Sequence, residues 1–226
     1  MKVKVDLHLH SFISRSNGDG IKWTSLFDSI SKLVENNVKI ASFSDHNKLD
    51  VNFYIEAKNL AKTANILLLP AIEVNVVRSD AQIANIIYVF DPDLEIEELI
   101  KISKIANQEI PKRGISLAKC NTIFQEFQTI KIPHVGKSDH FKYDDLLQIE
   151  YDAIEISNEN DKNYLSVMKK ENINTSVVAF SDTHKWNEYP QLKRLITLIE
   201  LENINFYELK KSLNKNINYT KRRVDD

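Results

Sequence analysis

The sequence predicts an α/β fold whose parallel strands form a barrel. Short apolar runs rich in branched residues alternate with stretches of helical periodicity, which is typical of buried parallel strands joined by helices. Several of these runs are followed directly by histidine, aspartate or glutamate. The carboxyl ends of the strands of such a barrel meet at one rim, so polar side chains in these positions converge there.

The first predicted strand carries the motif Asp6-Leu7-His8-Leu9-His10. Successive side chains of a strand point to opposite faces, so Asp6, His8 and His10 are expected on one face. Two imidazoles and a carboxylate have no role in apolar packing, because buried polar groups need partners. They are, however, ligands that zinc, manganese and iron accept. The alternative interpretation is a solvated strand edge that happens to carry histidines.

Four further polar clusters follow apolar runs in the same way. They are Ser44-Asp45-His46 after residues 40–43, Glu73 after 66–72, His134 after 130–133, and Ser181-Asp182-Thr183-His184 after 177–180. The five clusters together predict that histidines, aspartates and a glutamate meet at a single rim. We interpret Asp6 and Asp45 as residues that orient neighbouring imidazoles through hydrogen bonds.

Helical segments complete the alternation. Thr24 is the expected N-cap of a helix that runs to about residue 35, and Asp50 is the expected N-cap of a second helix. Residues 93–128 are expected to be helical in parts, with interruptions at Pro111 and Gly114. Residues 152–156 predict another strand. We find no internal repeat and no flexible linker, and we expect one domain over residues 1–226.

The ordered motifs resemble those of the PHP family (polymerase and histidinol phosphatase domains). The resemblance rests on residues 6–11, 44–47, 71–73, 133–134 and 181–184, whose order and spacing match along the chain to about Leu213. It implies a distorted (β/α)7 barrel, a site for two or three divalent metal ions (manganese, zinc or iron) and hydrolysis of phosphate esters.

The resemblance also implies a set of metal ligands, carried over position by position. They are His8, His10, Asp19, His46, Glu73, His134, Asp182 and His184. In the family's pattern, Glu73 bridges two ions. The first ion is shared with His8, His10 and Asp182, and the second with His134. A third ion is held by His46, His184 and Asp19.

Two positions depart from the family's pattern. The loop after His10 is longer than usual, and Asp19 stands there as the equivalent of the family's ligand. Asn85 lies in the apolar run 83–90, about where the family has a histidine. Because an amide oxygen is a weaker ligand for zinc-like ions than imidazole is, the second metal position is expected to be weak or empty.

The expected reaction is attack of a metal-bound hydroxide on the phosphorus of a small phosphomonoester, such as a nucleotide or a sugar phosphate. Glu73 and Asp182 are the expected catalytic residues. His140 is a candidate general acid or substrate contact, or else a surface histidine. Arg15 and Lys137 lie on loops beside expected ligands, where they could bind a phosphate or be ordinary exposed cations.

The composition bears on which kinds of partner this protein can bind. The net charge of −2 does not indicate a nucleic-acid partner, which usually demands a basic surface. A nuclease acting on DNA or RNA ends nevertheless stays an alternative, as does a non-catalytic interaction module. The sequence leaves the oligomeric state and the identity of the metal open.

The remaining features point to an ordinary globular protein in a reducing compartment. Cys120 is the single cysteine, which excludes an internal disulfide, and we interpret it as a packing residue. Trp186 and Tyr189 are likewise interpreted as packing residues rather than as a wall for a ring. Neither a signal peptide nor a membrane span is apparent, so we expect a cytoplasmic protein without a membrane partner.

Overall fold

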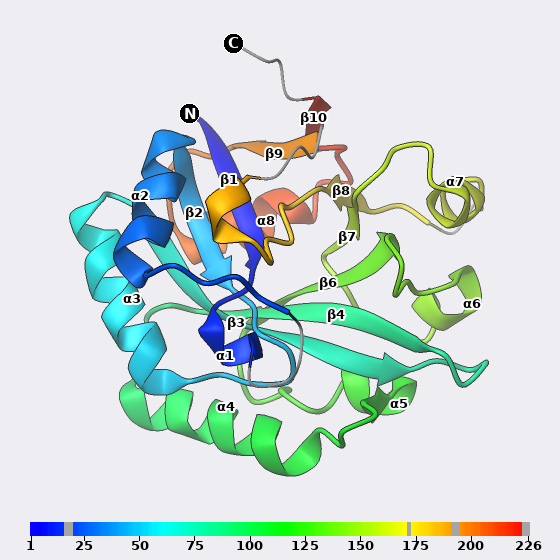
Figure 1. The fold of residues 1–226 in the computed structure, drawn as a ribbon. Coiled ribbons are helices and arrows are strands. Elements are labelled where there is room, and N and C mark those ends of the chain that lie inside the picture. The colour runs from blue at the N-terminus through cyan, green and yellow to red at the C-terminus, as the bar shows by residue number, and fades with distance from the viewer. Residues whose placement is uncertain (16–19, 171–172, 191–194, 223–226) are drawn as a thin grey trace.

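The computed structural model describes residues 1–15, 20–170, 173–190 and 195–222. It shows a strongly curved sheet with helices around its outside (Figure 1). The strands are β1 (Lys2–Leu9), β2 (Val38–Phe43), β3 (Leu67–Val77), β4 (Ile83–Phe90), β5 (Ile115–Ser116), β6 (Thr129–Gly136), β7 (Ala153–Ile156), β8 (Ser176–Val178), β9 (Leu195–Glu200) and β10 (Thr220–Arg222). Their order in the sheet is β10-β9-β1-β2-β3-β4-β6-β7-β8, and β5 pairs with β3. The expected α/β barrel class is confirmed.

The helices are α1 (Phe12–Arg15), α2 (Leu26–Glu35), α3 (Val51–Thr63), α4 (Ile96–Glu109), α5 (Leu117–Cys120), α6 (Tyr143–Leu146), α7 (Lys162–Met168) and α8 (Phe206–Leu213), with a 3₁₀ turn at Trp186–Glu188. Helix α2 begins one residue later than predicted. Ser25 is its N-cap, and the Ser25 hydroxyl accepts a hydrogen bond from the Asp28 amide at 3.0 Å. Asp50 caps α3 as predicted, through a 3.0 Å bond from the Phe53 amide. In the described part of the chain, no helix is both long and apolar enough to cross a membrane.

The strands are not all parallel. β1, β2 and β3 are parallel neighbours, as are β6, β7 and β8, but β4 runs antiparallel to both β3 and β6. The cause is the short turn between Val77 and Ile83, because a tight connection can join only antiparallel neighbours. β9 is also antiparallel to its neighbours β1 and β10. The reversal of β4 matters for the site, because it brings the beginning of that strand, and not its end, to the carboxyl-end rim.

The residues that face the inside of the barrel show why polar side chains gather at its rim. One apolar cluster holds alternate residues of the strands, among them Leu69 and Ala71 of β3 and Ile130 and Ile132 of β6, and it also includes residues of α8. Two residues farther along each strand, the same inward rows continue with a polar side chain at the rim. These continuations are Glu73 on β3, His134 on β6, Glu155 on β7, Asp182 after β8 and, on the reversed β4, Asn85. A second, larger apolar cluster lies between the sheet and the helices.

Strand β1 breaks this regular alternation. Its pairing with β2 shifts register between Asp6 and Leu9. Leu7 belongs to the inner apolar cluster and Leu9 to the outer one, although both were expected on the face opposite the histidines. The expectation that Asp6 shares one face with His8 and His10 therefore needs correction. The Asp6 carboxylate instead accepts bonds from the Ser181 amide at 3.1 Å and the Tyr189 hydroxyl at 3.0 Å.

Candidate metal centre

The structure gathers seven of the eight expected ligands at the carboxyl-end rim of the barrel. They form three overlapping groups whose donor atoms lie within 4.8 Å of one another: His8, His10 and Asp182; His8, Glu73 and His134; and His10, His46 and His184. Asp19 lies outside the described residues. Five strands or strand ends that are distant in sequence therefore deliver their polar side chains to one place.

The centre of the cluster is a cage of four donor atoms. Nε2 of His8 lies 3.1 Å from Nε2 of His10, 3.3 Å from Oε2 of Glu73 and 3.5 Å from Oδ1 of Asp182. Nε2 of His10 lies 3.4 Å from both carboxylate oxygens. We call these four atoms the four-donor cage.

The dimensions of the four-donor cage fit a small divalent ion. Zinc-type ions bind nitrogen and oxygen at about 2.1 Å, and four donors placed tetrahedrally at that distance are about 3.4 Å apart. The five separations that involve Nε2 of His8 or His10 are 3.1–3.5 Å, close to this value. Oε2 of Glu73 is also buried and receives no hydrogen bond from the described residues. A buried carboxylate oxygen without a hydrogen bond is costly unless a cation satisfies it.

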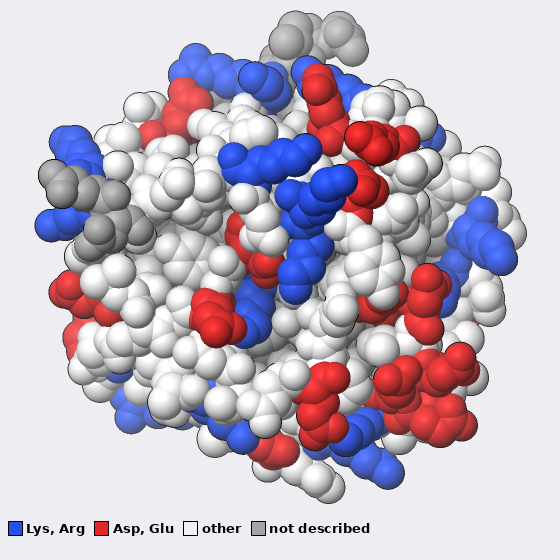
Figure 2. All heavy atoms as spheres, turned by 180° about the vertical axis from the view of Figure 1, so that it is seen from behind, with Lys and Arg blue, Asp and Glu red and all other residues white. Residues whose placement is uncertain are grey.

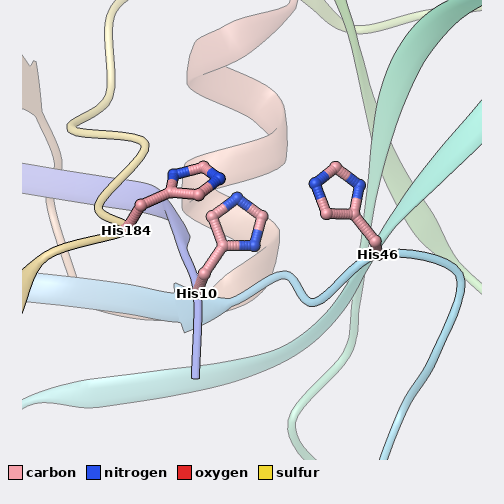
Figure 3. A group of neighbouring side chains, drawn as sticks. All are labelled: His10, His46 and His184. Atoms are coloured by element: carbon pink, nitrogen blue, oxygen red, sulfur yellow. The ribbon is translucent and has the colours of Figure 1, made fainter. Parts of the chain in front are cut away.

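The group of three imidazoles lies on the open side of the cluster. His10 comes from the end of β1, His46 from the loop after β2 and His184 from the segment after β8 (Figure 3). The ring centroid of His10 lies 4.9 Å from that of His46 and 4.3 Å from that of His184. The His46 and His184 side chains are 19% and 33% exposed, whereas those of His8, His10 and Glu73 are almost fully buried. A substrate would therefore approach from the side of His46 and His184.

Asn85 lies beside the group of His8, Glu73 and His134, with its amide nitrogen toward Glu73. Its amide nitrogen donates a 2.9 Å hydrogen bond to Oε1 of Glu73, so hydrogens rather than a lone pair point toward that carboxylate. His134 lies nearby, with Nε2 at 3.5 Å from the same oxygen. The hydrogen bond from Asn85 uses a lone pair of Glu73 that a second ion would need, which is compatible with the expectation of a weak or empty position there.

Glu155 is a site residue that the sequence analysis missed. Its carboxylate is buried and lies 2.9 Å from Nδ1 of His8 and 3.1 Å from Nε2 of His134. The signal was present, since a lone carboxylate stands within the apolar strand Ala153–Ile156. Glu155 stands alone inside its strand, whereas Glu73, His134 and Asp182 each directly follow an apolar run in the sequence.

Lys137 reaches into the same cluster. Its Nζ atom lies 2.9 Å from Oδ2 of Asp182, 3.0 Å from Oε1 of Glu155 and 3.0 Å from Nδ1 of His8, and its side chain is 7% exposed. It is therefore not an ordinary exposed cation. Burial alone would lower the pKa of Lys137, but the carboxylates of Asp182 and Glu155 outweigh burial and raise it, so the ammonium stays charged.

The charges of the cluster compensate one another. Burial would raise the pKa of Glu73, but the nearby imidazoles of His8 and His46 hold it well below its usual range. Burial would lower the pKa of His8, but the carboxylates led by Glu155 raise it to about 10. His10 behaves differently, because burial dominates and lowers its pKa to about 3. His10 is thus neutral near pH 7, which is the form that binds metals.

Hydrogen bonds hold the ligands in place from behind. Nδ1 of His10 lies 3.2 Å from the Ser14 hydroxyl, which donates to Oδ1 of Asp45 at 2.7 Å. Asp45 thus orients His10 through Ser14, close to the expectation for it. The indole of Trp186 donates to the His10 carbonyl at 2.7 Å and is fully buried, which agrees with our interpretation of Trp186 as a packing residue.

The other expected site residues are less closely connected to the cluster. His140 is half-buried, and its Nδ1 lies 2.7 Å from the carbonyl oxygen of Lys137. That contact joins it to the loop of Lys137 and not to the clustered carboxylates. Arg15 is the last residue of α1, and its side chain is outside the described part of the structure.

Comparisons with known proteins find similarity in fold. No protein-family model and no curated protein matches the chain. Among solved structures, the lesion-specific endonuclease EndoQ of Pyrococcus furiosus has a TM-score of 0.66 at 14% identity, over 95% of this chain and 56% of that one. This chain therefore spans little more than half the length of the endonuclease.

Two further structures match over nearly their whole length. A "putative metal-dependent phosphoesterase" of Bifidobacterium adolescentis has a TM-score of 0.60 at 12% identity, over 93% of this chain and 96% of that one. An amidohydrolase of Chromobacterium violaceum, solved with bound sulfate and no metal, has a TM-score of 0.60 at 14% identity, over 99% of both chains. At such low identities these similarities establish the barrel fold that the chain shares with them.

Proposed function

We propose that this protein is a metal-dependent hydrolase of phosphate esters, of the PHP type that its motifs resemble. The observation that carries the proposal is the four-donor cage, in which a carboxylate oxygen of Glu73 and one of Asp182 each lie 3.3–3.5 Å from the Nε2 atoms of His8 and His10, the spacing of neighbouring ligands on a small divalent ion. When bound, a divalent ion supplies an activated water for attack on phosphorus and neutralises charge on the phosphoryl oxygens.

The chain's own residues have distinct tasks in this proposal. His8, His10, Glu73 and Asp182 would hold one ion, and His46 and His184 would hold another on the open side. Glu155 would keep the lone pair of His8 directed into the cage, because a carboxylate at Nδ1 places the proton on that nitrogen.

Lys137 is a positioning residue in the same scheme. Its ammonium contacts two carboxylates, Asp182 and Glu155, and so balances negative charge that would otherwise accumulate beside the cage. The expected roles of His140 as a general acid or substrate contact, and of Arg15 and Lys137 in phosphate binding, stay proposals.

The preferred substrate is a small phosphomonoester, and hydrolysis of phosphodiesters in nucleic acid is the second candidate. Figure 2 shows the face behind that of Figure 1, where Lys and Arg side chains form a short band and acidic side chains lie beside it. Charge on this face is mixed, and the whole chain is slightly acidic with a net charge of −2. A polyanion normally requires a broad basic surface, which favours the small substrate. The name of the endonuclease with the same fold keeps the second candidate open.

The test is a metal titration joined to a substrate panel. The purified protein is stripped with a chelator, reloaded with manganese, zinc or iron, and analysed for bound metal. It is then given phosphomonoesters, a chromogenic phosphodiester and short single strands. Metal-dependent phosphate release from monoesters is expected. Shortening of the strands without monoester hydrolysis would favour the second candidate, and no turnover with any metal would refute both.

A matched pair of variants ties activity to the cage. Glu73→Gln keeps the size of the side chain but removes the charge that faces the cage, whereas Glu126→Gln makes the same change at an exposed side chain paired with Lys101. We expect loss of metal and turnover in the first variant only.

A further inference from the structure

A cavity opens directly beside the open side of the cluster. Its volume is about 830 Å³, and it is lined by His46 of the candidate metal centre together with residues from β3, β4 and the end of α4. This volume lies within the range of small-molecule sites, which is roughly 300–1,000 Å³. We call it the amide cavity, because four of its lining residues are asparagines: Asn47, Asn75, Asn85 and Asn107.

The strands place these amides next to the cage. Asn75 lies two residues after Glu73 on β3, so both side chains are on the same face of the sheet. Asn75 is directly opposite Asn85 on the antiparallel strand β4. Ile83 lies on the same strand as Asn85 and two residues before it, which places Ile83 farther from the cage. Moving outward from Glu73, the sheet therefore presents a metal ligand, then two amides, then an apolar side chain.

Another part of the lining is the segment that follows α4. Ile110, Pro111 and Lys112 line the cavity there. The backbone at Gly114 closes tightly on β3, because a Cβ atom at this position would lie 2.5 Å from the carbonyl oxygen of Asn75. Gly114 also has a φ of +110°, which favours glycine. This part of the lining is therefore fixed against the strand that carries the amides.

One buried amide oxygen at the edge of the cavity has an unused bonding capacity among the described residues. Asn85 is 6% exposed, and its amide nitrogen is committed to Glu73, but its Oδ1 atom is buried and receives no hydrogen bond from the described residues. A buried carbonyl oxygen of this kind needs a donor. Asn47 is already used for structure, since its Oδ1 accepts a 2.9 Å hydrogen bond from the backbone N–H of Asn75.

We propose that the amide cavity binds the leaving group of the substrate, and that this group carries a planar polar ring of the nucleobase type. This inference rests on the proposed function, because it assumes that the phosphate is held at the metal centre. Asparagine amides donate and accept at once, which matches the edge of a heterocyclic base. Ile83, Ile110 and Pro111 supply apolar surface for the faces of the ring.

The cavity fits a single nucleotide better than a strand. Its charged lining residues, Lys48, Lys112 and Asp139, together with the neutral amides, give a net charge of about +1. A groove for a polynucleotide needs several cations to neutralise successive phosphates. The substrate class inferred here is therefore a nucleoside monophosphate.

The first test uses binding and needs neither metal nor turnover. Saturation-transfer NMR on the metal-stripped protein is recorded with adenosine and uridine, and with ribose as the ring-free comparison. We expect transfer to the base protons of both nucleosides. Asn75→Leu should weaken this binding about tenfold, because an apolar side chain of similar size cannot pair with the base. Gln108→Leu, on α4 but not in the cavity lining, is the control and should bind like the parent protein.

The second test uses the loaded enzyme and separates the two hypotheses. The ratio of kcat/KM for a nucleoside 5′-monophosphate to that for glycerol 3-phosphate should exceed tenfold and fall sharply in Asn75→Leu. Hydrolysis of both esters with equal efficiency, together with no nucleoside binding, would overturn the inference and leave the proposed function intact. Preference for oligonucleotides over mononucleotides would also overturn it. Nucleoside binding that Asn75→Leu abolishes, in a protein that hydrolyses no phosphoester, would support the cavity's role and refute the proposed function.

Discussion

Glu155 and His8 are a buried pair in which Oε2 of the glutamate lies 2.9 Å from Nδ1 of the imidazole. The other nitrogen of His8 faces Glu73 and Asp182 in the cage. This arrangement fixes the ring and holds the proton on Nδ1, so a metal ion that binds at Nε2 would displace only the second proton, which the carboxylates stabilise in its absence.

The pair leads to the first prediction. Glu155→Gln should lower metal affinity about 10- to 100-fold, because the amide holds His8 less firmly and no longer balances Lys137. Affinity is measured by competition with a chromogenic chelator. Glu150→Gln, at a side chain that is 80% exposed, is the control. Equal affinities in the two variants would show that Glu155 does not position His8.

Removal of a cage carboxylate should have a stronger effect. We expect Glu73→Ala and Asp182→Ala each to abolish measurable turnover and to reduce bound metal, since each removes a charged donor from the four-donor cage. Metal content is determined by elemental analysis of the purified variants, and circular dichroism checks their folding. Full activity with normal metal content in both variants would eliminate this site.

Asn85→His should add a metal ligand. The change removes the hydrogen bond to Oε1 of Glu73 and places an imidazole near His134, so the second metal position gains a nitrogen donor. The expected result is an increase of about one bound ion per chain after reloading, as the family pattern implies for a histidine here. An unchanged metal count would mean that Asn85 is not what weakens this position.

Cys120 should be unreactive in the folded protein. Burial raises its pKa to about 12, so the thiol is protonated at pH 8 and contributes little thiolate. A chromogenic disulfide reagent is expected to leave the native protein unlabelled at pH 8 and to label it promptly in denaturant. Because the folded pKa exceeds the unfolded one, the free energy of unfolding should also decline as pH rises past the pKa of the unfolded thiol. Rapid labelling of the native protein would contradict the buried position.

Much of the site could be predicted from sequence because its residues follow recognisable strands. Glu73, His134 and Asp182 each come after an apolar run, and parallel strands bring such positions together. Asn85 was found only through the family resemblance, because the reversed β4 delivers a residue from its start to the rim. Glu155 was missed for a similar reason, since nothing in a four-residue strand says which end approaches the cluster.

Contacts between loops and side chains were the least predictable. The residue numbers of Lys137, Asp182 and Glu155 give no indication that one ammonium lies within 3.0 Å of both carboxylates. The shift of register in β1, which moved Asp6 toward Ser181 and Tyr189, depends on pairing with β2 and leaves no mark in the motif itself. These contacts depend on how distant strands and loops pack against one another, and no local pattern in a single sequence indicates that packing.

The ladder of the curved sheet is interrupted between β8 and β9. Strands β8 and β9 do not pair in the described sheet. In place of backbone pairing, the hydroxyl of Thr197 on β9 accepts a hydrogen bond from the Ala179 amide and donates one to the Ala179 carbonyl, both at 2.8 Å. Asp182 lies three residues after Ala179 in the sequence. The chain before β10 adds two backbone hydrogen bonds at this junction, from the Val177 amide to the Ile217 carbonyl at 3.0 Å and from the Tyr219 amide to the Val177 carbonyl at 2.9 Å. These few bonds, and not a continuous strand ladder, close the ring next to the proposed chemistry, and amide hydrogen exchange at Val177 and Ala179 would report their opening.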